Sequence, residues 1–288
     1  MAEPLSPIVS SAWLAAHRED ADLVILDASA YMPMERRDGR EEFLRARIPG
    51  ARFLDVDEVA DIESDLPHML PSPARFARQV AALGLHNHQR IVIYDQKGLF
   101  SAARGWWLFK VFGHDAVAVL DGGLPKWRAE DGVIEAGEPA PVEVGRFQPA
   151  FRASRVRGLG DMLANLKSGS ALVLDARSPE RYAGTVAEPR PGLRSGHIPG
   201  SRSLPFQALL NADHTYKPQA VLQRLFIEQG VGADSDVVVS CGSGLTACVL
   251  ALGLELAGFS PASVYDGSWS EWGAQPDGVA PLRTGFEP

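Results

Sequence analysis

The chain has 288 residues, 45% of them hydrophobic and 22% charged, and its formal net charge is −8. These values are typical of a soluble globular protein long enough for two domains. No apolar run approaches the ~20 residues of a transmembrane helix, and the N-terminus has no signal-peptide pattern. A net negative charge without a Lys/Arg-dense stripe argues against nucleic acid or an anionic membrane as a partner.

Two similar series of motifs follow one another along the chain. The first series is LVILDAS (Leu23–Ser29), RIPGARFLD (Arg47–Asp55), RIVIYDQKG (Arg90–Gly98) and VLDGGLPKW (Val119–Trp127). The second is ALVLDARS (Ala171–Ser178), HIPGSRSLP (His197–Pro205), DVVVSCGSG (Asp236–Gly244) and VYDGSWSEW (Val264–Trp272). Each motif recurs 145 to 150 residues later, in the same order. This regularity predicts an internal duplication.

Short β-branched runs alternate with segments of helical period in both halves. The predicted strands are Leu23–Asp27, Ile91–Tyr94, Leu172–Asp175 and Val237–Ser240. The predicted helices include Pro73–Leu83, Gly158–Lys167 and Thr246–Ala257, the last apolar nearly all round and therefore deeply buried. Such alternation predicts an α/β fold with parallel sheets covered on both faces.

A stretch between the halves, Glu130–Pro149, is rich in Pro, Gly and acidic residues and has no apolar period. Its composition is typical of a linker. We therefore predict an N-terminal domain over residues 1–132, a linker over 133–152 and a C-terminal domain over 153–288.

The only two cysteines are Cys241 and Cys248. Two helical turns would separate their Cα atoms by roughly 10 Å, which is too far for a disulfide. Two unpaired cysteines suggest a reducing compartment, and we expect the cytoplasm. They cannot form a structural zinc site alone, and we expect neither a metal nor a cofactor. The simplest interpretation of either cysteine is a small buried hydrophobic residue.

Cys241 follows a predicted strand and precedes a Gly-rich turn that enters a helix. Ligands bind at the carboxyl ends of parallel strands. Gly242 and Gly244 tolerate the positive φ of a tight turn, and the N–H groups of such a turn can surround an anion. This environment favours a reactive thiolate and then a persulfide anion. The first-half counterpart of Cys241 is Asp95, so only the second half offers a nucleophile.

Along nearly its whole length the chain resembles the tandem rhodanese-type sulfurtransferases. The loop C-G-S-G-L-T (Cys241–Thr246) is similar to the 3-mercaptopyruvate branch, which usually reads C-G-S/T-G-V-T, whereas the thiosulfate branch reads C-R-K-G-V-T. Leu245 in place of Val is a small departure. The stretch Asp266–Trp272 (DGSW-x-E-W) and the HIPG turns match as well.

The resemblance implies two tandem rhodanese-like domains, of which the C-terminal one is catalytic. It implies that Cys241 takes sulfur from 3-mercaptopyruvate as a persulfide, releases pyruvate, and passes the sulfur to thioredoxin, another thiol or cyanide. It also implies that Gly242, Gly244, Leu245 and Thr246 contribute to the substrate site.

The resemblance also assigns two arginines to the substrate carboxylate. Thiosulfate carries its charge close to the attacked sulfur, so basic loop residues suit it, whereas mercaptopyruvate has a carboxylate farther from its sulfur. The segment E-R-Y-A-G-T-V-A-E-P-R supplies Arg181 and Arg190 as cations at that distance. Guanidinium groups form bidentate hydrogen bonds to carboxylates. From the residues alone, the surface ion-pair arginine is the favoured interpretation of each.

A Ser–His–Asp arrangement is the last feature that the resemblance implies. Its positions match Ser243, His68 in PHMLP and Asp57 in LDVDEV. Cleavage of the C–S bond of mercaptopyruvate leaves an enolate, and a hydroxyl linked to an imidazole can assist its protonation. His68 and Asp57 lie in the first half, so this site would form between the domains. Taken alone, His68 is better interpreted as a structural or surface histidine.

Three other functions compete with this one. A thiosulfate sulfurtransferase shares the fold and the cysteine. A related cysteine-dependent phosphatase needs C-x5-R, but Ala247 stands where the arginine would be. A non-catalytic sulfur-carrier or scaffold module is the third. The physiological acceptor and the oligomeric state stay open.

Overall fold

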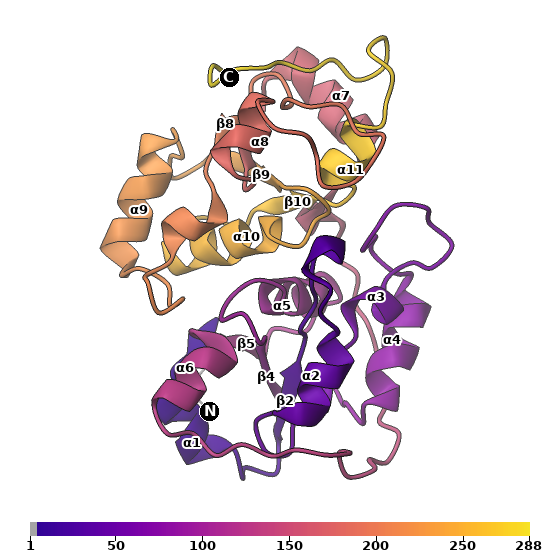
Figure 1. Cartoon of the computed structure of the whole chain (residues 1–288), viewed down its shortest axis with the longest axis vertical. Coiled ribbons are helices and arrows are strands. Elements are labelled where there is room, and N and C mark those ends of the chain that lie inside the picture. Colours follow the sequence, from indigo (N-terminus) through magenta and orange to yellow (C-terminus); the bar gives the residue numbers. More distant parts are fainter. Residues whose placement is uncertain (1–4) are drawn as a thin grey trace. The chain divides into compact units, whose positions relative to one another are not determined.

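The computed structural model describes residues 5–288, and their contacts group them into two compact units (Figure 1). Of the described residues, the first unit contains 5–62, Leu70–Arg152 and Asn211–Tyr216. The second unit contains Glu63–Met69, Ala153–Leu210 and Lys217–Pro288. Each half of the chain therefore contributes one short segment to the unit built mainly from the other half.

The first unit contains a parallel sheet in the order β1-β5-β4-β2-β3. Its strands are β1 (Ile8–Val9), β2 (Leu23–Asp27), β3 (Arg52–Phe53), β4 (Arg90–Tyr94) and β5 (Val117–Leu120). Its helices are α1 (Ser11–His17), η1 (Pro33–Glu35), α2 (Gly39–Arg45), α3 (Val56–Val59), α4 (Pro73–Ala82), α5 (Ala102–Val111) and α6 (Gly123–Ala129).

The second unit repeats this plan, with a parallel sheet in the order β6-β10-β9-β7-β8. Its strands are β6 (Val156–Arg157), β7 (Ala171–Asp175), β8 (Arg202–Ser203), β9 (Asp236–Ser240) and β10 (Ser263–Tyr265). Its helices are η2 (Ala153–Arg155), α7 (Leu159–Ser168), α8 (Pro179–Ala183), η3 (Phe206–Leu209), α9 (Gln219–Glu228), α10 (Ala247–Leu256) and α11 (Ser268–Trp272). The predicted α/β fold with two duplicated parallel sheets is confirmed, and each predicted strand and helix lies within one residue of its observed ends.

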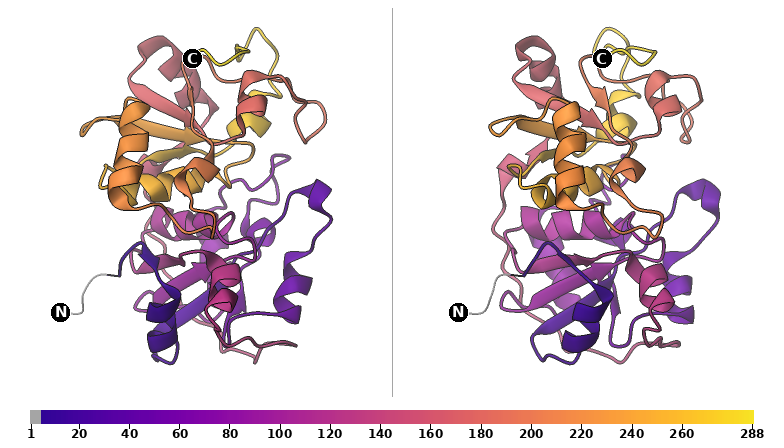
Figure 2. Two further views of the ribbon diagram at one scale, coloured as in Figure 1. Left: turned by 60° about the vertical axis from the view of Figure 1, so that its left-hand side comes forward. Right: turned by 90° about the vertical axis from the view of Figure 1, so that its left-hand side faces the viewer.

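Helices lie on both faces of the sheets, as the apolar strands predict (Figures 1 and 2). In the first unit, Ile93 of β4 faces Gly105 of α5 on one side of the sheet. The preceding residue, Val92, points to the opposite side and packs with Leu14 of α1 and Trp127 of α6. In the second unit, α10 packs against β9 and β10, and its residues from Ala247 to Leu254 are all buried. None of the helices within residues 5–288 is long and apolar enough to span a bilayer.

Residues 133–152, the predicted linker, run along the first unit. Arg47 and Glu135 pair as an isolated antiparallel bridge, and the Gly145 N–H donates to the Ala81 carbonyl. The boundaries at 132 and 153 stay a prediction.

A buried aspartate ends the same strand in each unit, but its partners differ. Asp175, at the end of β7, binds Arg177 with Nη2 2.6 Å from Oδ2. Asp27, at the end of β2, has Ser29 at the equivalent position and accepts hydrogen bonds from its N–H at 2.9 Å and from its hydroxyl at 2.5 Å. Burial raises the pKa of Asp27 to about 6, because these hydrogen bonds offset only part of the desolvation.

We expect Asp27 to make the unfolding free energy depend on pH. Its folded pKa of about 6 lies above its ordinary value of 3.8, so the folded state binds the proton more tightly and stability falls as pH rises through that window. Above this pH window, the buried ionised carboxylate lowers the unfolding free energy by about 3 kcal/mol. Stability of the Asp27→Asn variant should decline less than that of the wild-type protein, with Asp121, whose pKa burial also raises to about 6, still contributing.

Urea unfolding across that pH range measures the effect. Glu19→Gln is the control for loss of one charge, because the Glu19 side chain is 79% exposed. A parallel decline in the wild-type protein and Asp27→Asn would contradict the prediction.

Candidate active site

Cys241 directly follows β9, at the carboxyl end of the second unit's sheet, and only 2% of it is exposed. The residues Cys241–Thr246, here called the Cys241 loop, connect β9 to α10 (Figure 1). Gly244 has a φ of +77°, a left-handed conformation that favours glycine. The predicted strand, Gly-rich turn and helix are therefore present.

The first turn of α11 holds the start of this loop. Ser268 Oγ accepts a hydrogen bond from the Cys241 N–H at 3.1 Å and donates one to the Tyr265 carbonyl at 2.8 Å. The Trp269 N–H donates to the Cys241 carbonyl at 3.0 Å, and the Gly242 carbonyl accepts from both the N–H and the hydroxyl of Ser270. Sequence reasoning matched this DGSW-x-E-W stretch without giving its residues a role.

The first unit shows what the equivalent loop binds. Asp95–Ser101, here called the Asp95 loop, follows β4 as the Cys241 loop follows β9. The Asp95 carboxylate accepts hydrogen bonds from five backbone N–H groups at 2.7–2.9 Å, those of Lys97, Gly98, Phe100, Ser101 and Ala102. This copy of the loop is therefore an anion-binding arrangement of N–H groups, occupied by its own side chain.

The segment Glu63–Met69 brings His68 to the Cys241 loop within the second unit. His68 is buried, and its Nδ1 lies 2.9 Å from Ser243 Oγ and 3.2 Å from the Ser243 carbonyl oxygen. When Nδ1 accepts the hydroxyl proton of Ser243, Nε2 carries the ring proton. The structure thus brings together two residues that lie far apart in the sequence.

Asp57, the third member of the predicted arrangement, lies in the first unit. It is exposed in the first turn of α3, whose N-cap is Asp55. Its pairing with His68 stays a prediction.

Arg181 of α8 lies against the Cys241 loop. A Cβ atom added to Gly242 would lie 2.9 Å from Arg181 Nη2. The same Nη2 lies 2.5 Å from Glu188 Oε2, and Nε lies 3.3 Å from Glu188 Oε1. Arg190 is partly buried near the end of the segment that follows α8, and its binding to a carboxylate stays a prediction.

The other predicted residues of the loop are mostly enclosed. Leu245 is buried, Thr246 is partly buried, and Gly244 O accepts a hydrogen bond from Cys248 Sγ at 3.2 Å. Cys248 itself is fully buried in α10. Both cysteines are free thiols. Within residues 5–288 no group of three or more His, Cys, Asp or Glu side chains could hold a metal ion.

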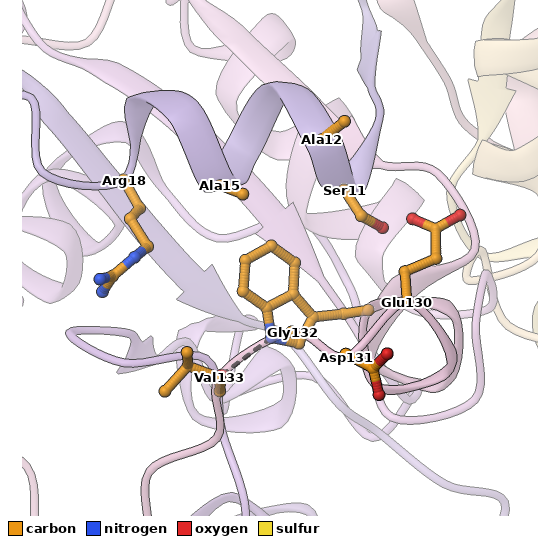
Figure 3. Close-up of a pocket in the computed structure, with 9 residues that line it drawn as sticks. Ser11, Ala12, Ala15, Arg18, Glu130, Asp131, Gly132 and Val133 are labelled. Atoms are coloured by element: carbon orange, nitrogen blue, oxygen red, sulfur yellow. Dashed lines mark hydrogen bonds between the residues drawn. The ribbon is translucent and has the colours of Figure 1, made fainter.

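A pocket of about 250 Å³ lies in the first unit, between α1 and the end of α6 (Figure 3). Trp127 lines it, with its indole N–H donating to the Val133 carbonyl at 2.9 Å. None of the predicted site residues lines this pocket, so the candidate site rests on the Cys241 loop.

We expect Ser268 to be needed for the stability of the Cys241 loop. Ser268→Ala would leave the buried Cys241 N–H and Tyr265 carbonyl without this partner, at a cost of about 1–3 kcal/mol. Ser270→Ala is a matched control, because the Gly242 carbonyl keeps the Ser270 N–H as a donor. Urea unfolding of both variants tests this, and equal losses would contradict it.

Comparisons with known proteins cover both halves of the chain. The rhodanese-like domain family matches residues 10–130 and again 159–275. The chain is 43% identical to thiosulfate/3-mercaptopyruvate sulfurtransferase 1, mitochondrial, of Arabidopsis thaliana, over 94% of this chain and 77% of the relative. It is 40% identical to 3-mercaptopyruvate sulfurtransferase of Escherichia coli K12, over 93% of this chain and 95% of the relative.

A solved structure is similar along nearly the whole chain. The crystal structure of SseA from Escherichia coli, described with the fold and mechanism of 3-mercaptopyruvate sulfotransferases, matches with a TM-score of 0.84 and 36% identity. The match covers 92% of this chain and 99% of that one. With both halves matched by the family and the duplicated sheets in place, the chain belongs to the rhodanese family as a protein with two rhodanese-like domains.

Proposed function

We propose that this protein is a 3-mercaptopyruvate sulfurtransferase whose nucleophile is Cys241. The observation that carries the proposal is the position of Cys241 in a loop whose duplicate binds an anion through five backbone N–H groups. The equivalent N–H groups of the Cys241 loop would stabilise first the thiolate and then the persulfide anion. Relatives that carry this activity in their names support the proposal.

In the first half-reaction, the Cys241 thiolate attacks the sulfur of 3-mercaptopyruvate. A bond forms between the two sulfur atoms, the C–S bond of the donor breaks, and its electron pair moves to carbon to give the enolate of pyruvate. Protonation of that carbon gives pyruvate, and Cys241 retains the added sulfur as a persulfide.

The proton for the enolate comes through Ser243 and His68 in this proposal. The Ser243 hydroxyl, 2.9 Å from His68 Nδ1, gives up its proton and is reprotonated through the imidazole. Asp57 would orient the imidazole. Sulfite, the group that leaves from thiosulfate, is a stable anion and needs no proton.

The donor carboxylate is bound by Arg181 and Arg190 in this proposal. Guanidinium groups bind carboxylates in a bidentate manner. The neutral residues Gly242 and Ser243 favour mercaptopyruvate over the dianion thiosulfate, because no loop cation lies beside the attacked sulfur. Since the name of the Arabidopsis relative includes both donors, thiosulfate is the second candidate donor.

In the second half-reaction, an acceptor attacks the outer sulfur of the persulfide and the Cys241 thiolate returns. We propose a thiol acceptor such as thioredoxin, with cyanide as an alternative. We also propose a reducing compartment, the cytoplasm, since both cysteines are free and buried.

Treatment with 3-mercaptopyruvate in the absence of an acceptor should leave one added sulfur atom on the peptide that contains Cys241. Peptide mass spectrometry measures this, together with the pyruvate released. Cys248→Ser is the control and should keep most activity, because a serine hydroxyl can still donate to the Gly244 carbonyl that Cys248 Sγ contacts at 3.2 Å. Finding the added sulfur on Cys248 would overturn the assignment.

Ser243→Ala and His68→Ala should each slow turnover of mercaptopyruvate by about 10²–10⁴-fold, the usual loss when a general acid–base group is removed. The double variant should be little slower than either, because the two residues act as a unit. Thiosulfate turnover should fall much less. Equal losses with both donors would mean that these residues shape the site instead of moving a proton.

A further inference from the structure

A chain of four charged side chains, three buried and one partly buried, runs from the end of β7 to the Cys241 loop, within the second unit. Its members in order are Asp175, Arg177, Glu188 and Arg181. The side chains of Arg177 and Glu188 are 0% and 1% exposed. Burying charges is costly, so an arrangement of this kind needs either excellent geometry or a function.

Arg177 is the fixed end of this chain. Its Nη2 donates to Asp175 Oδ2 at 2.6 Å and to the Gly196 carbonyl at 2.8 Å, and its guanidinium lies over the Trp269 ring at 4.2 Å. Its remaining Nη1 donates to Glu188 Oε1 at 2.9 Å. Arg177, which is fixed at the end of β7, therefore holds the Glu188 carboxylate in place.

Glu188 in turn fixes the direction of Arg181. It accepts from Arg181 Nε and Nη2, which leaves Nη1 without a hydrogen bond in the part of the chain that the structure describes. The guanidinium is thereby held over Gly242, where a Cβ atom would lie 2.9 Å from Nη2 and 3.6 Å from Nη1. A cation thus reaches the loop from α8, and the missing side chain at Gly242 gives it room.

We propose that Glu188 is a positioning residue for the donor's carboxylate: it orients Arg181 so that the free Nη1 edge faces the substrate. This inference rests on the proposed function. The first unit, which has Asp95 in place of the nucleophile, has Ser29 where the second has Arg177, so it lacks the anchor of this chain. A purely structural alternative is that Glu188 only neutralises Arg177.

Glu188→Gln keeps the shape of the side chain, removes its charge and leaves Arg177 bound to Asp175. KM for mercaptopyruvate should rise about tenfold or more, the loss expected for a misaligned charged hydrogen bond, with kcat nearly unchanged. KM for thiosulfate should change much less. Glu180→Gln on the same helix is the control, because Glu180 is exposed and should leave both values unchanged.

A double-variant cycle with Arg181→Lys tests whether Glu188 acts through Arg181. If it does, Glu188→Gln should change KM for mercaptopyruvate by less than about twofold in the Arg181→Lys background, because coupled residues are not additive. If Glu188→Gln changed KM for mercaptopyruvate by the same factor with Arg181 and with Arg181→Lys, the proposal would be overturned. An unchanged KM in the folded Glu188→Gln variant would also overturn it. If Glu188→Gln does not fold, Glu188→Asp retains the charge and should raise the same KM, since its shorter side chain does not span the contacts to both Arg177 and Arg181.

Persulfide formation distinguishes failure of this inference from failure of the proposed function. At saturating mercaptopyruvate, Glu188→Gln should still place sulfur on Cys241. If the wild-type protein forms no persulfide from mercaptopyruvate, the proposed function fails. If it does and KM is insensitive to Glu188, only the positioning role fails.

Discussion

Each half of the chain has a loop at the carboxyl end of a parallel strand, and in the first half this loop directs several N–H groups at a single anion. In the Asp95 loop the anion is a carboxylate of the chain itself, with five N–H donors around it. In the Cys241 loop the corresponding position holds a thiol. We propose that the fold sets where negative charge is stabilised in both units, and that the residue at this position, Asp95 or Cys241, makes that charge structural or reactive.

The sequence predicts the repeated parts of this architecture well, because they depend on local patterns. Apolar strands such as β4 and the nearly all-apolar α10 follow from hydrophobic periodicity, and the duplication follows from motifs repeated in order. The Gly-rich loop after β9 is predicted by the two glycines, Gly242 and Gly244, that come after Cys241 at the end of an apolar strand. These features depend on neighbours in sequence, which a single sequence displays directly.

The contacts around the loop were harder to predict, because they join distant positions. The exchanged segments Glu63–Met69 and Asn211–Tyr216 carry no local signal of the unit that they join. His68 entered the candidate site only through a family resemblance, although it lies 2.9 Å from Ser243 Oγ. The roles of Ser268 and Glu188 were missed, since neither a hydrogen bond to a loop N–H nor a shared carboxylate leaves a periodic pattern.

We propose that the preference for mercaptopyruvate over thiosulfate depends on which element supplies the cation at the active site. Arg181 reaches Gly242 from α8 and is held by Glu188, so the loop itself stays neutral beside Cys241. The most direct measurement is kcat/KM for 3-mercaptopyruvate and for thiosulfate with the same thiol acceptor. We predict a clearly higher kcat/KM for mercaptopyruvate, with pyruvate released in step with sulfur transfer. An equal or higher value for thiosulfate would contradict it.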